Sequence, residues 1–403
     1  MHTSTKRRSA IAWLAALALL LAACGSSDAD SAADEASSDD TSTEAGETES
    51  TDDGGDAEAG DEGSDDMAAM PGEGVSVTMA KADWATEDPN AYVAQALLTE
   101  LGYDVSDPAD LELGPATAYL TMAQGDADFW INSWYPGHNS WLANEMPDGS
   151  TVGDHISPVG EMMMAGGLQG YLVTKSFADE YGITSLDDLN DNAEALAAYD
   201  AGDPVPGNGI ADIYGCQESW TCDDIIESQI AFSGWENIQQ SIAGYDAMFA
   251  EAETKANAGE PMVIYTWTPS AYITKLRPGD NVLWLEVNDV IDDSNPLGVE
   301  GGEGHDQTPG TAGIGAEQCP GSDGECQLGW VAADIQVTAN NEWLAANPAA
   351  ASLLEQFQMN VVDVSLMNVE MDGGADVTEL ATQWIEDNRD LVDGWLETAR
   401  AAG

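Results

Sequence analysis

The pattern of apolar and polar positions predicts alternating strands and helices from residue 75 onward. Short apolar runs bounded by turn residues predict strands, and apolar residues three or four positions apart predict helices. The predicted strands cover residues 75–80, 128–132, 170–174, 262–266, 282–287 and 334–339. The predicted helices cover residues 89–101, 115–124, 176–181, 223–232, 242–258, 348–359, 363–371, 378–388 and 391–401. This alternation indicates an α/β fold, and the length is ample for two lobes.

The first residues are typical of an exported lipoprotein. Basic residues at 6–8 precede an apolar run at 11–21 that is shorter than an ordinary membrane span. The run ends in Leu21-Ala22-Ala23-Cys24-Gly25, which resembles the bacterial lipobox. This resemblance implies removal of residues 1–23 and a diacylglycerol on the Cys24 sulfur. The mature protein is then held on the extracytoplasmic face of the cell membrane, periplasmic or at the cell surface. The alternative is an N-terminal transmembrane anchor that happens to contain a cysteine.

Residues 24–73 are predicted to comprise the lipidated cysteine and the disordered tether that follows it. The segment is mostly Ser, Asp, Glu, Gly, Ala and Thr, and it has no aromatic residue, Lys or Arg. The whole chain has 74 Asp+Glu against 10 Lys+Arg, a formal net charge of −64. Most of these acids lie beyond the tether, so the folded part is strongly acidic too. This charge excludes nucleic acid as a partner and indicates a salt-adapted source.

Four cysteines remain when Cys24 is assigned to the lipid. They form two close pairs, Cys216 with Cys222 and Cys319 with Cys326. In an exported protein, each pair is expected to form a local disulfide. A four-thiolate zinc site is the alternative, but neither pair has the two-residue spacing of a zinc knuckle, so we expect no metal.

Three tryptophans occur in settings that a buried core does not require. Trp134 lies in Ser133-Trp134-Tyr135-Pro136-Gly137-His138, and Trp267 lies in Tyr265-Thr266-Trp267-Thr268-Pro269. Each follows a predicted strand, and the carboxyl ends of strands are where ligands gather in α/β sheets. Trp220 lies inside the short Cys216–Cys222 loop. Rigid aromatic walls of this kind suit a quaternary ammonium, although each ring taken alone can also be explained as packing.

Anion donors are expected beside these rings. The Cys216–Cys222 loop ends where the predicted helix at 223–232 begins, so the backbone N–H groups of Thr221 and Cys222 are free to bind an anion. His138 can donate a hydrogen bond to a carboxylate without adding a fixed charge. Together these groups predict a site for a zwitterion that has separate cation and carboxylate ends.

At these residues the chain resembles the glycine betaine/proline betaine substrate-binding proteins of osmoprotectant ABC importers. The resemblance spans the globular part. It rests on Gly170-Tyr171-Leu172-Val173-Thr174-Lys175, on the cysteine-bracketed Trp220, on the Tyr-Thr-Trp-Thr-Pro string at Trp267, and on Asp393-Gly394-Trp395 near the end.

The resemblance implies a type II periplasmic-binding-protein fold, in which two α/β lobes close on a ligand that is delivered to an ABC transporter permease. Lobe one would comprise residues 74–169 and 333–403, and lobe two residues 170–332. The family's tryptophan box falls on Trp134, Trp220 and Trp267. Its carboxylate contacts fall on His138 and on the backbone N–H groups of Thr221 and Cys222.

The chain departs from the family pattern in several places. Tyr135 stands in a different tripeptide after the first box tryptophan and is a minor candidate for a ligand contact. Thr221 stands where a Gly is familiar, which narrows the loop. Trp84 is a further candidate wall, although packing is the simpler explanation. Residues 300–328 form a Gly-rich insertion around Cys319 and Cys326 to which no function is assigned.

Three other functions are weighed against betaine binding. A binding protein for choline or another quaternary amine would use the aromatic walls but leave the anion donors without a partner. A surface-anchored enzyme is disfavoured because the chain has no Gly-x-Ser-x-Gly elbow, no His-Glu-x-x-His motif and no P-loop. A passive adhesion lipoprotein would not require three caged tryptophans.

Overall fold

The computed structural model describes residues 70–287, 311–315, 318–319 and 325–403, all of which belong to one compact unit, Ser64–Gly403. The predicted signal sequence, Cys24, almost all of the predicted tether and much of the Gly-rich insertion lie outside the described residues. Within the described ranges, no helix is both long and apolar enough to span a bilayer.

A nine-stranded mixed sheet runs through the molecule in the order β4-β2-β5-β13-β6-β9-β7-β8, and β10 also pairs with β6. Its strands are β2 (Met79–Ala82), β4 (Glu112–Leu113), β5 (Phe129–Tyr135), β6 (Ile156–Thr174), β7 (Ala211–Tyr214), β8 (Ile238–Ser241), β9 (Val263–Thr268), β10 (Val282–Trp284) and β13 (Ala333–Asn340). Two smaller pairs are β1 (Ser76–Val77) with β3 (Asp104–Val105), and β11 (Thr311–Gly315) with β12 (Glu325–Val331).

The long strand β6 joins the two lobes. Residues 156–167 of β6 pair with β13, and residues 168–173 pair with β9. The strand therefore changes partner at the Gly167–Leu168 peptide, close to the predicted lobe boundary after residue 169. Strand β12 is followed almost directly by β13, which returns the chain to lobe one.

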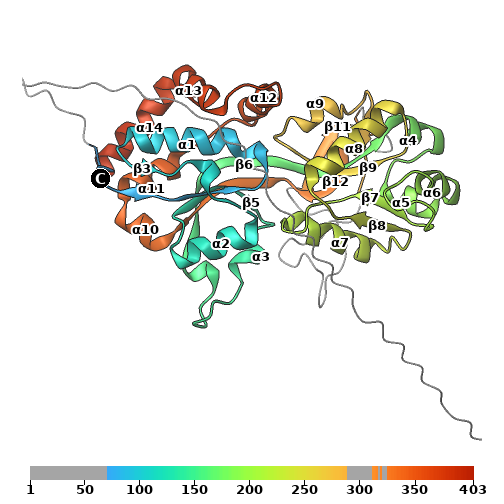
Figure 1. Ribbon diagram of the computed structural model, residues 1–403, viewed down its shortest axis with the longest axis horizontal. Helices are drawn as coiled ribbons and strands as arrows, with labels where there is room; N and C mark the ends of the chain where they lie inside the picture. Colours follow the sequence, from blue (N-terminus) through green and yellow to red (C-terminus); the bar gives the residue numbers. More distant parts are fainter. Residues whose placement is uncertain (1–69, 288–310, 316–317, 320–324) are drawn as a thin grey trace, which may run out of the picture. The chain divides into compact units, whose positions relative to one another are not determined.

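Lobe one carries the N-terminal and C-terminal helices. Figure 1 shows α1 beside the C-terminal helices, while α2 and α3 lie on the other side of the sheet. The helices are α1 (Asp88–Glu100), α2 (Pro115–Gln124), α3 (Asn139–Leu142), α10 (Asn341–Ala346), α11 (Pro348–Gln356), α12 (Val361–Asp372), α13 (Val377–Asp387) and α14 (Arg389–Ala402). Short 3₁₀ turns are η1 (Ala85–Glu87), η2 (Pro108–Asp110) and η3 (Val152–Asp154).

Within its described residues, lobe two contains the second half of β6, strands β7 to β10 and six helices. These are α4 (Lys175–Tyr181), α5 (Leu186–Asp191), α6 (Ala193–Asp200), α7 (Thr221–Ser233), α8 (Tyr245–Ala258) and α9 (Tyr272–Lys275). Helices α4, α7 and α8 each end at a glycine in the left-handed conformation, Gly182, Gly234 and Gly259, which is the usual C-terminal stop.

The apolar side chains form two buried clusters. One fills lobe one between the sheet and helices α1 and α11–α14. The other extends from the cleft side of lobe one through lobe two, and it contains Trp84, Trp130, Trp220 and Trp267. The aromatic residues near the cleft are therefore anchored in a continuous core.

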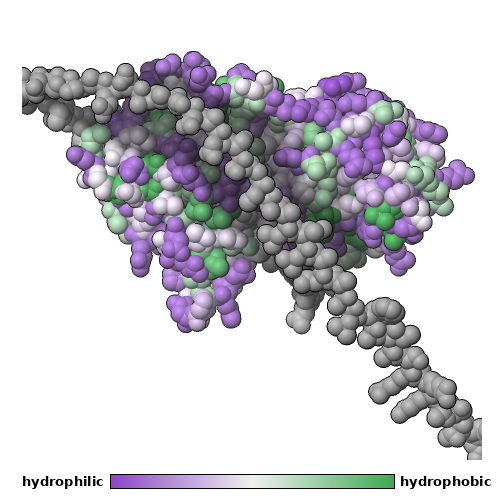
Figure 2. Space-filling model, in the orientation of Figure 1, coloured by the Kyte–Doolittle hydropathy of each residue, from purple (hydrophilic) through white to green (hydrophobic). Residues whose placement is uncertain are grey.

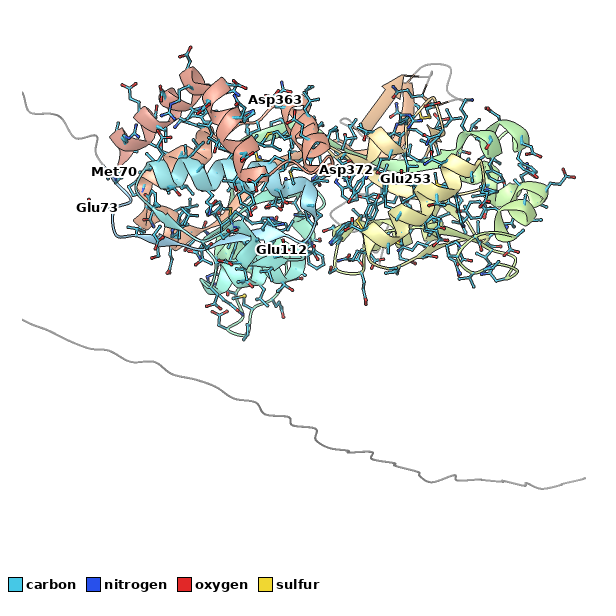
Figure 3. The ribbon with its side chains drawn as sticks, turned by 45° about the horizontal axis from the view of Figure 1, so that its top comes forward. Met70, Glu73, Glu112, Glu253, Asp363 and Asp372 are labelled. Carbon is cyan, nitrogen blue, oxygen red and sulfur yellow. A yellow bond between two sulfur atoms is a disulfide. The ribbon has the colours of Figure 1, made fainter. Side chains whose placement is uncertain are left out.

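The surface is polar and acidic, as the composition predicts. Hydrophilic side chains cover most of the face in Figure 2. Carboxylates lie on the surface of both lobes, for example Glu112 and Asp363 in lobe one and Glu253 in lobe two (Figure 3).

The predicted alternation of strands and helices is confirmed, with differences at element ends. The predicted strand at 75–80 is two strands, because β1 pairs with β3 while β2 pairs with β4 and β5. Strand β6 begins at Ile156, well before the predicted residue 170, and β7 and β8 were not predicted. The predicted disulfides are confirmed, since Cys216 bonds to Cys222 and Cys319 bonds to Cys326.

Candidate functional site

A cleft between the lobes brings together most of the residues singled out from the sequence. Its lining residues come from both sides of the Gly167–Leu168 crossing. They are Trp84, Pro115, Trp134, Gly137, His138, Gln169, Trp220, Thr221, Cys222, Ile225, Tyr265 and Trp267. The three predicted box tryptophans, His138, Thr221 and Cys222 are all present, and Trp84 is a fourth tryptophan in the wall.

Trp220 is the central ring of the aromatic group. Its ring centroid lies 5.3 Å from that of Trp84 and 5.5 Å from that of Trp267, and both pairs are close to perpendicular. Tyr245 packs behind this corner, 4.6 Å from Trp267 and 5.7 Å from Trp220. Rings at right angles to one another form the corner of a box, and the supporting contacts limit their movement.

The four indole N–H groups are all used by hydrogen bonds within the protein. Trp220 Nε1 donates to Asp83 Oδ1 (2.7 Å), and Trp267 Nε1 donates to Thr86 Oγ1 (3.2 Å). Asn132 Oδ1 accepts from both Trp134 Nε1 (2.6 Å) and Trp84 Nε1 (3.3 Å). The rings therefore offer a ligand π surface rather than a donor, which suits a cation that cannot accept a hydrogen bond.

Trp134 and Trp267 lie within strands rather than beyond them. The sequence predicts strand ends at residues 132 and 266, but β5 continues to Tyr135 and β9 to Thr268. A proline follows each strand directly and begins the turn. The expectation that both tryptophans follow the end of a strand is therefore wrong, because β-sheet pairing holds both of them.

A glycine makes room for Trp134. A Cβ atom at Gly167 would lie 2.5 Å from the ring atom Cζ3 of Trp134. This distance is far below van der Waals contact, so only glycine allows the indole to rest on the crossing strand.

His138 is a buried, neutral donor. Its Nδ1 accepts a hydrogen bond from the backbone N–H of Trp134 (3.2 Å), which leaves the hydrogen of the neutral ring on Nε2. The ring stacks on Trp130 at 5.4 Å, and burial lowers its pKa from 6.5 to about 3. At neutral pH, His138 therefore adds an N–H donor to the cleft but no charge.

The amide donors lie at the start of α7. Trp220 is the N-cap residue and makes no side-chain cap hydrogen bond, so no cap occupies the first N–H groups of the helix. The helix runs for 13 residues, and its dipole places a partial positive charge at this N-terminal end.

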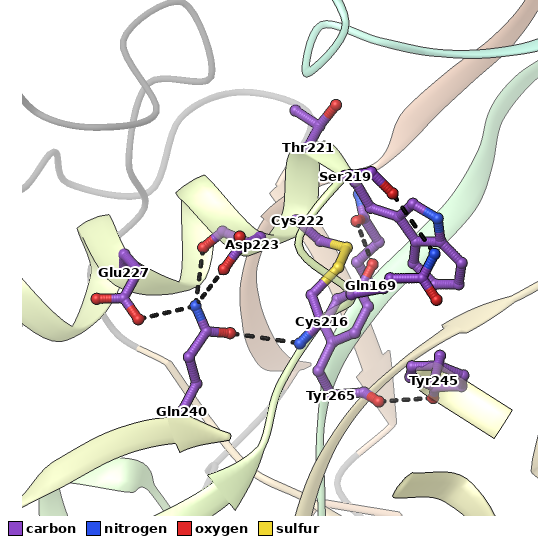
Figure 4. The surroundings of a disulfide bond; sticks show 12 residues. Gln169, Cys216, Ser219, Thr221, Cys222, Asp223, Glu227, Gln240, Tyr245 and Tyr265 are labelled. Atoms are coloured by element: carbon purple, nitrogen blue, oxygen red, sulfur yellow. Dashed lines mark hydrogen bonds between the residues drawn. A yellow bond between two sulfur atoms is a disulfide. The ribbon is translucent and has the colours of Figure 1, made fainter. Parts of the chain in front are cut away.

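Gln240 holds the disulfide loop in place through hydrogen bonds. Its Oε1 accepts from Cys216 N (3.3 Å), and its Nε2 donates to Asp223 Oδ1 (2.7 Å) and Glu227 Oε1 (2.9 Å) (Figure 4). Burial and the acidic neighbours Asp224 and Glu227 raise the pKa of Asp223 to about 6.

Tyr135 does not line the cleft. It is buried, its hydroxyl accepts from Tyr119 (2.9 Å), and it shares a second hydrogen bond with Thr338 Oγ1 (2.8 Å). Tyr119 also approaches His138 Nδ1 at 3.3 Å. Tyr135 thus belongs to a network of hydrogen-bonded hydroxyl groups next to His138.

Several residues of the site were not identified from the sequence. Gln169 lines the cleft from β6, and its Oε1 accepts from Tyr265 OH (2.7 Å). Asp83 and Asn132 hold the indole N–H groups. Their only sequence signal is a polar residue at or near the end of an apolar strand, which is common on any surface.

Glu87 is a buried carboxyl group beneath the aromatic wall. Its oxygens accept from Trp130 Nε1 (3.0 and 3.1 Å) and from Ala82 N (2.7 Å). Burial raises its pKa to about 8, although Lys81 opposes that shift. Trp130 in turn packs against Trp84 at 5.7 Å, so Glu87 helps to place the wall.

Comparisons with known proteins agree with this architecture. A family model described as the substrate binding domain of ABC-type glycine betaine transport system matches residues 75–387. The glycine betaine/proline betaine-binding periplasmic proteins of Salmonella typhimurium and Escherichia coli are 29% and 28% identical over 340 residues, covering 83% of this chain and 93% of theirs.

Solved structures show the same fold. A lactococcal protein of this kind, in a closed conformation with glycine betaine, superposes with a TM-score of 0.54 at 17% identity, covering 80% of this chain and 99% of its own. A choline-binding protein of an ABC transporter, in complex with choline, gives a TM-score of 0.55 at 15% identity, covering 81% and 96%. A glycine betaine/L-proline-binding protein from Borrelia burgdorferi gives 0.57 at 13% identity, covering 81% and 99%.

The predicted two-lobed binding-protein fold is confirmed by these structures, and the exclusion of an enzyme is confirmed by the family. The chain belongs to the family of substrate-binding domains of ABC-type glycine betaine transport systems.

Proposed function

We propose that this protein captures glycine betaine or proline betaine outside the cell and delivers it to an ABC transporter permease. The observation that carries the proposal is a cleft of four tryptophans whose N–H groups are all engaged elsewhere, directly beside a neutral histidine and a helix N-terminus.

The aromatic walls would hold the alkylated ammonium group. Each indole face contributes about 0.5–2 kcal/mol to a desolvated cation. Trp134, Trp220 and Trp267 are the proposed box, and Trp84 is added because it lines the cleft and packs against Trp220.

The other end of the cleft would hold the carboxylate. Hydrogen bonds from His138 Nε2 and from the backbone N–H groups of Thr221 and Cys222 would be charge-assisted and therefore strong. The ligand as a whole is neutral, so the acidic surface neither attracts nor repels it strongly.

Choline is the alternative ligand. A structurally similar protein binds choline, and choline offers the same ammonium group to the box. Its lack of a carboxylate would leave the N–H donors of His138, Thr221 and Cys222 without a charged partner. An unmatched buried donor typically costs about 1–3 kcal/mol, so the site favours a betaine.

Closure would follow from the distribution of these contacts. Trp134 and His138 belong to the lobe that contains β5, whereas Trp220, Thr221 and Trp267 belong to the lobe that contains α7 and β9. A ligand that touches both groups binds the closed state better than the open state and therefore shifts the population toward it. The proposed division is residues 74–169 and 333–403 for lobe one and residues 170–332 for lobe two.

The location follows from the N-terminal sequence and the relatives. Two relatives are named periplasmic proteins, and residues 1–23 have the features of a lipoprotein signal. We propose that a lipid on Cys24 and the acidic segment 24–73 tether the protein to the outer face of the membrane, where it can reach the permease.

Substitution of a box tryptophan is expected to weaken betaine binding without unfolding the protein. Trp220→Ala should lower the affinity by about twofold to thirtyfold, the factor that corresponds to losing one cation–π contact of about 0.5–2 kcal/mol. Trp343→Ala is the matched control, because Trp343 is also nearly buried but packs on Phe129 in lobe one, outside the cleft. Equal loss of affinity in both variants, measured by calorimetry, would contradict the box.

His138→Ala is expected to separate the two ligand classes. Loss of the Nε2 donor should weaken glycine betaine by tenfold or more and choline by much less, because only betaine has a carboxylate to accept the hydrogen bond. Titration of both ligands against wild type and variant measures this difference. If both ligands lost affinity by the same factor, His138 would not be a carboxylate contact.

Betaine affinity is expected to stay constant between pH 7 and pH 9. With its pKa lowered to about 3, His138 is already neutral throughout this range. Asp223, with a pKa of about 6, is already mostly ionised. A histidine that bound the carboxylate as a cation with an ordinary pKa would instead lose about tenfold in affinity per pH unit above 6.5. A hundredfold decline over the two pH units would show that the bound histidine is charged.

A further inference from the structure

A hydrogen bond outside the aromatic box joins the two lobes at the anion end of the cleft. Trp141 lies on α3 of lobe one, and its Nε1 donates to Thr221 Oγ1 (2.8 Å) at the first residue of α7 in lobe two. Trp141 does not line the cleft. Its indole therefore meets the opposite lobe without being placed to meet a ligand.

The Thr221 side chain makes a second contact with lobe one, through its methyl group. A Cβ atom at Gly137 would lie 3.6 Å from the Thr221 methyl carbon, so the backbone of Gly137 is close to it. The hydroxyl and methyl groups of Thr221 thus both contact the segment that carries His138. The proposed carboxylate contact of Thr221 uses its backbone N–H, so the side chain is free for this separate role.

In the described part of the chain, the other side-chain contacts between the lobes either support the aromatic walls or are exposed to solvent, unlike the Trp141–Thr221 bond. Asp83 and Thr86 bind the N–H groups of box tryptophans, and Asp83 also accepts from Gln217 Nε2 (3.1 Å), so changing Asp83 or Thr86 would also disturb the walls. Lys275 and Asp372 form an ion pair between α9 and α12, but both side chains are more than a third exposed to solvent, and salt weakens such pairs. Trp141 and Thr221 form a neutral, partly buried bond that salt leaves intact.

We propose that Trp141 and the Thr221 hydroxyl form a closure latch, a bond made when the lobes close and broken when they open. The latch favours the closed state by a fixed amount whatever ligand is bound. A neutral hydrogen bond of this kind corresponds to about twofold to tenfold in an equilibrium constant. Because it acts on closure, it raises the affinity for every ligand by the same factor and slows release more than it speeds capture.

This inference rests on the proposed function for its ligands, and its test uses both betaine and choline. Trp141→Phe removes the donor and keeps an aromatic ring, and Thr221→Val removes the acceptor and keeps the shape and the backbone N–H. Each variant is expected to weaken both ligands by the same factor, about twofold to tenfold, with most of the change in the dissociation rate. The double variant should be no weaker than either single variant, because one bond is lost in all three.

Trp343→Phe is the matched control, since it makes the same indole-to-phenyl change at a nearly buried residue outside the cleft and should retain the wild-type affinity. Three results would overturn the latch: additive losses in the double variant, a loss that affects betaine alone, or unchanged affinity in Trp141→Phe. The betaine-selective loss would instead make Trp141 part of the carboxylate site.

A wild-type protein that bound neither ligand would overturn the proposed function and leave the latch to be tested directly. Spin labels placed on exposed positions of each lobe report the distances between the lobes in the ligand-free protein. Trp141→Phe and Thr221→Val should each reduce the short-distance population, and an unchanged distribution in both would overturn the latch.

Discussion

The engagement of every cleft indole N–H by an acceptor within the protein is the constraint on which the site depends. An indole with a free N–H would favour a ligand that can accept a hydrogen bond, and it would rotate to find one. Asp83, Thr86 and Asn132 remove this option and fix each ring with its face available. A cation that can neither donate nor accept a hydrogen bond then has the lowest free-energy cost of leaving water. The π faces replace a hydration shell that was only weakly bound.

The same hydrogen bonds couple the aromatic box to lobe closure. Trp220 and Trp267 belong to lobe two, yet their N–H groups are held by Asp83 and Thr86 of lobe one. These two bonds would be lost if the lobes separated, so the proposed walls would reach their final orientation only on closure. The proposed carboxylate end also spans both lobes, since His138 and the start of α7 come from different lobes. Under the proposed function, a ligand that needs both ends would be held only by the closed molecule, which would link recognition to closure.

The sequence predicted the parts of this structure that depend on local order. Helix α2 was predicted at its observed ends because Pro115 begins it and Gly125 ends it in the left-handed conformation. The disulfide loop and its tryptophan were identified because the cysteines are six residues apart. The family resemblance then assigned Trp267 to the same site as Trp134 and His138, although it is far from both of them in the chain.

The missed features depend on contacts between distant segments. Asp83 and Trp220 are 137 positions apart, and nothing in the Ala82-Asp83-Trp84 sequence indicates that this carboxylate meets an indole. The first half of β6 was not predicted because its alternation is interrupted by Pro158, Gly160 and Glu161, and its pairing with β13 decides the outcome. Trp84 was only a minor candidate for the wall, because nothing in the sequence indicates that it lines the cleft, where the chain turns into η1 directly after it.

The most direct test of the account is a calorimetric titration of the chain without its first 24 residues, at low and high salt. Glycine betaine, proline betaine, carnitine, choline and ectoine are the ligands to compare. We expect a betaine to bind most tightly and choline to bind more weakly. Salt should change the betaine affinity little, because the ligand is neutral and the aromatic contacts are partly buried. No binding of any quaternary ammonium compound, or tighter binding of choline than of both betaines, would contradict the assignment of a zwitterion site.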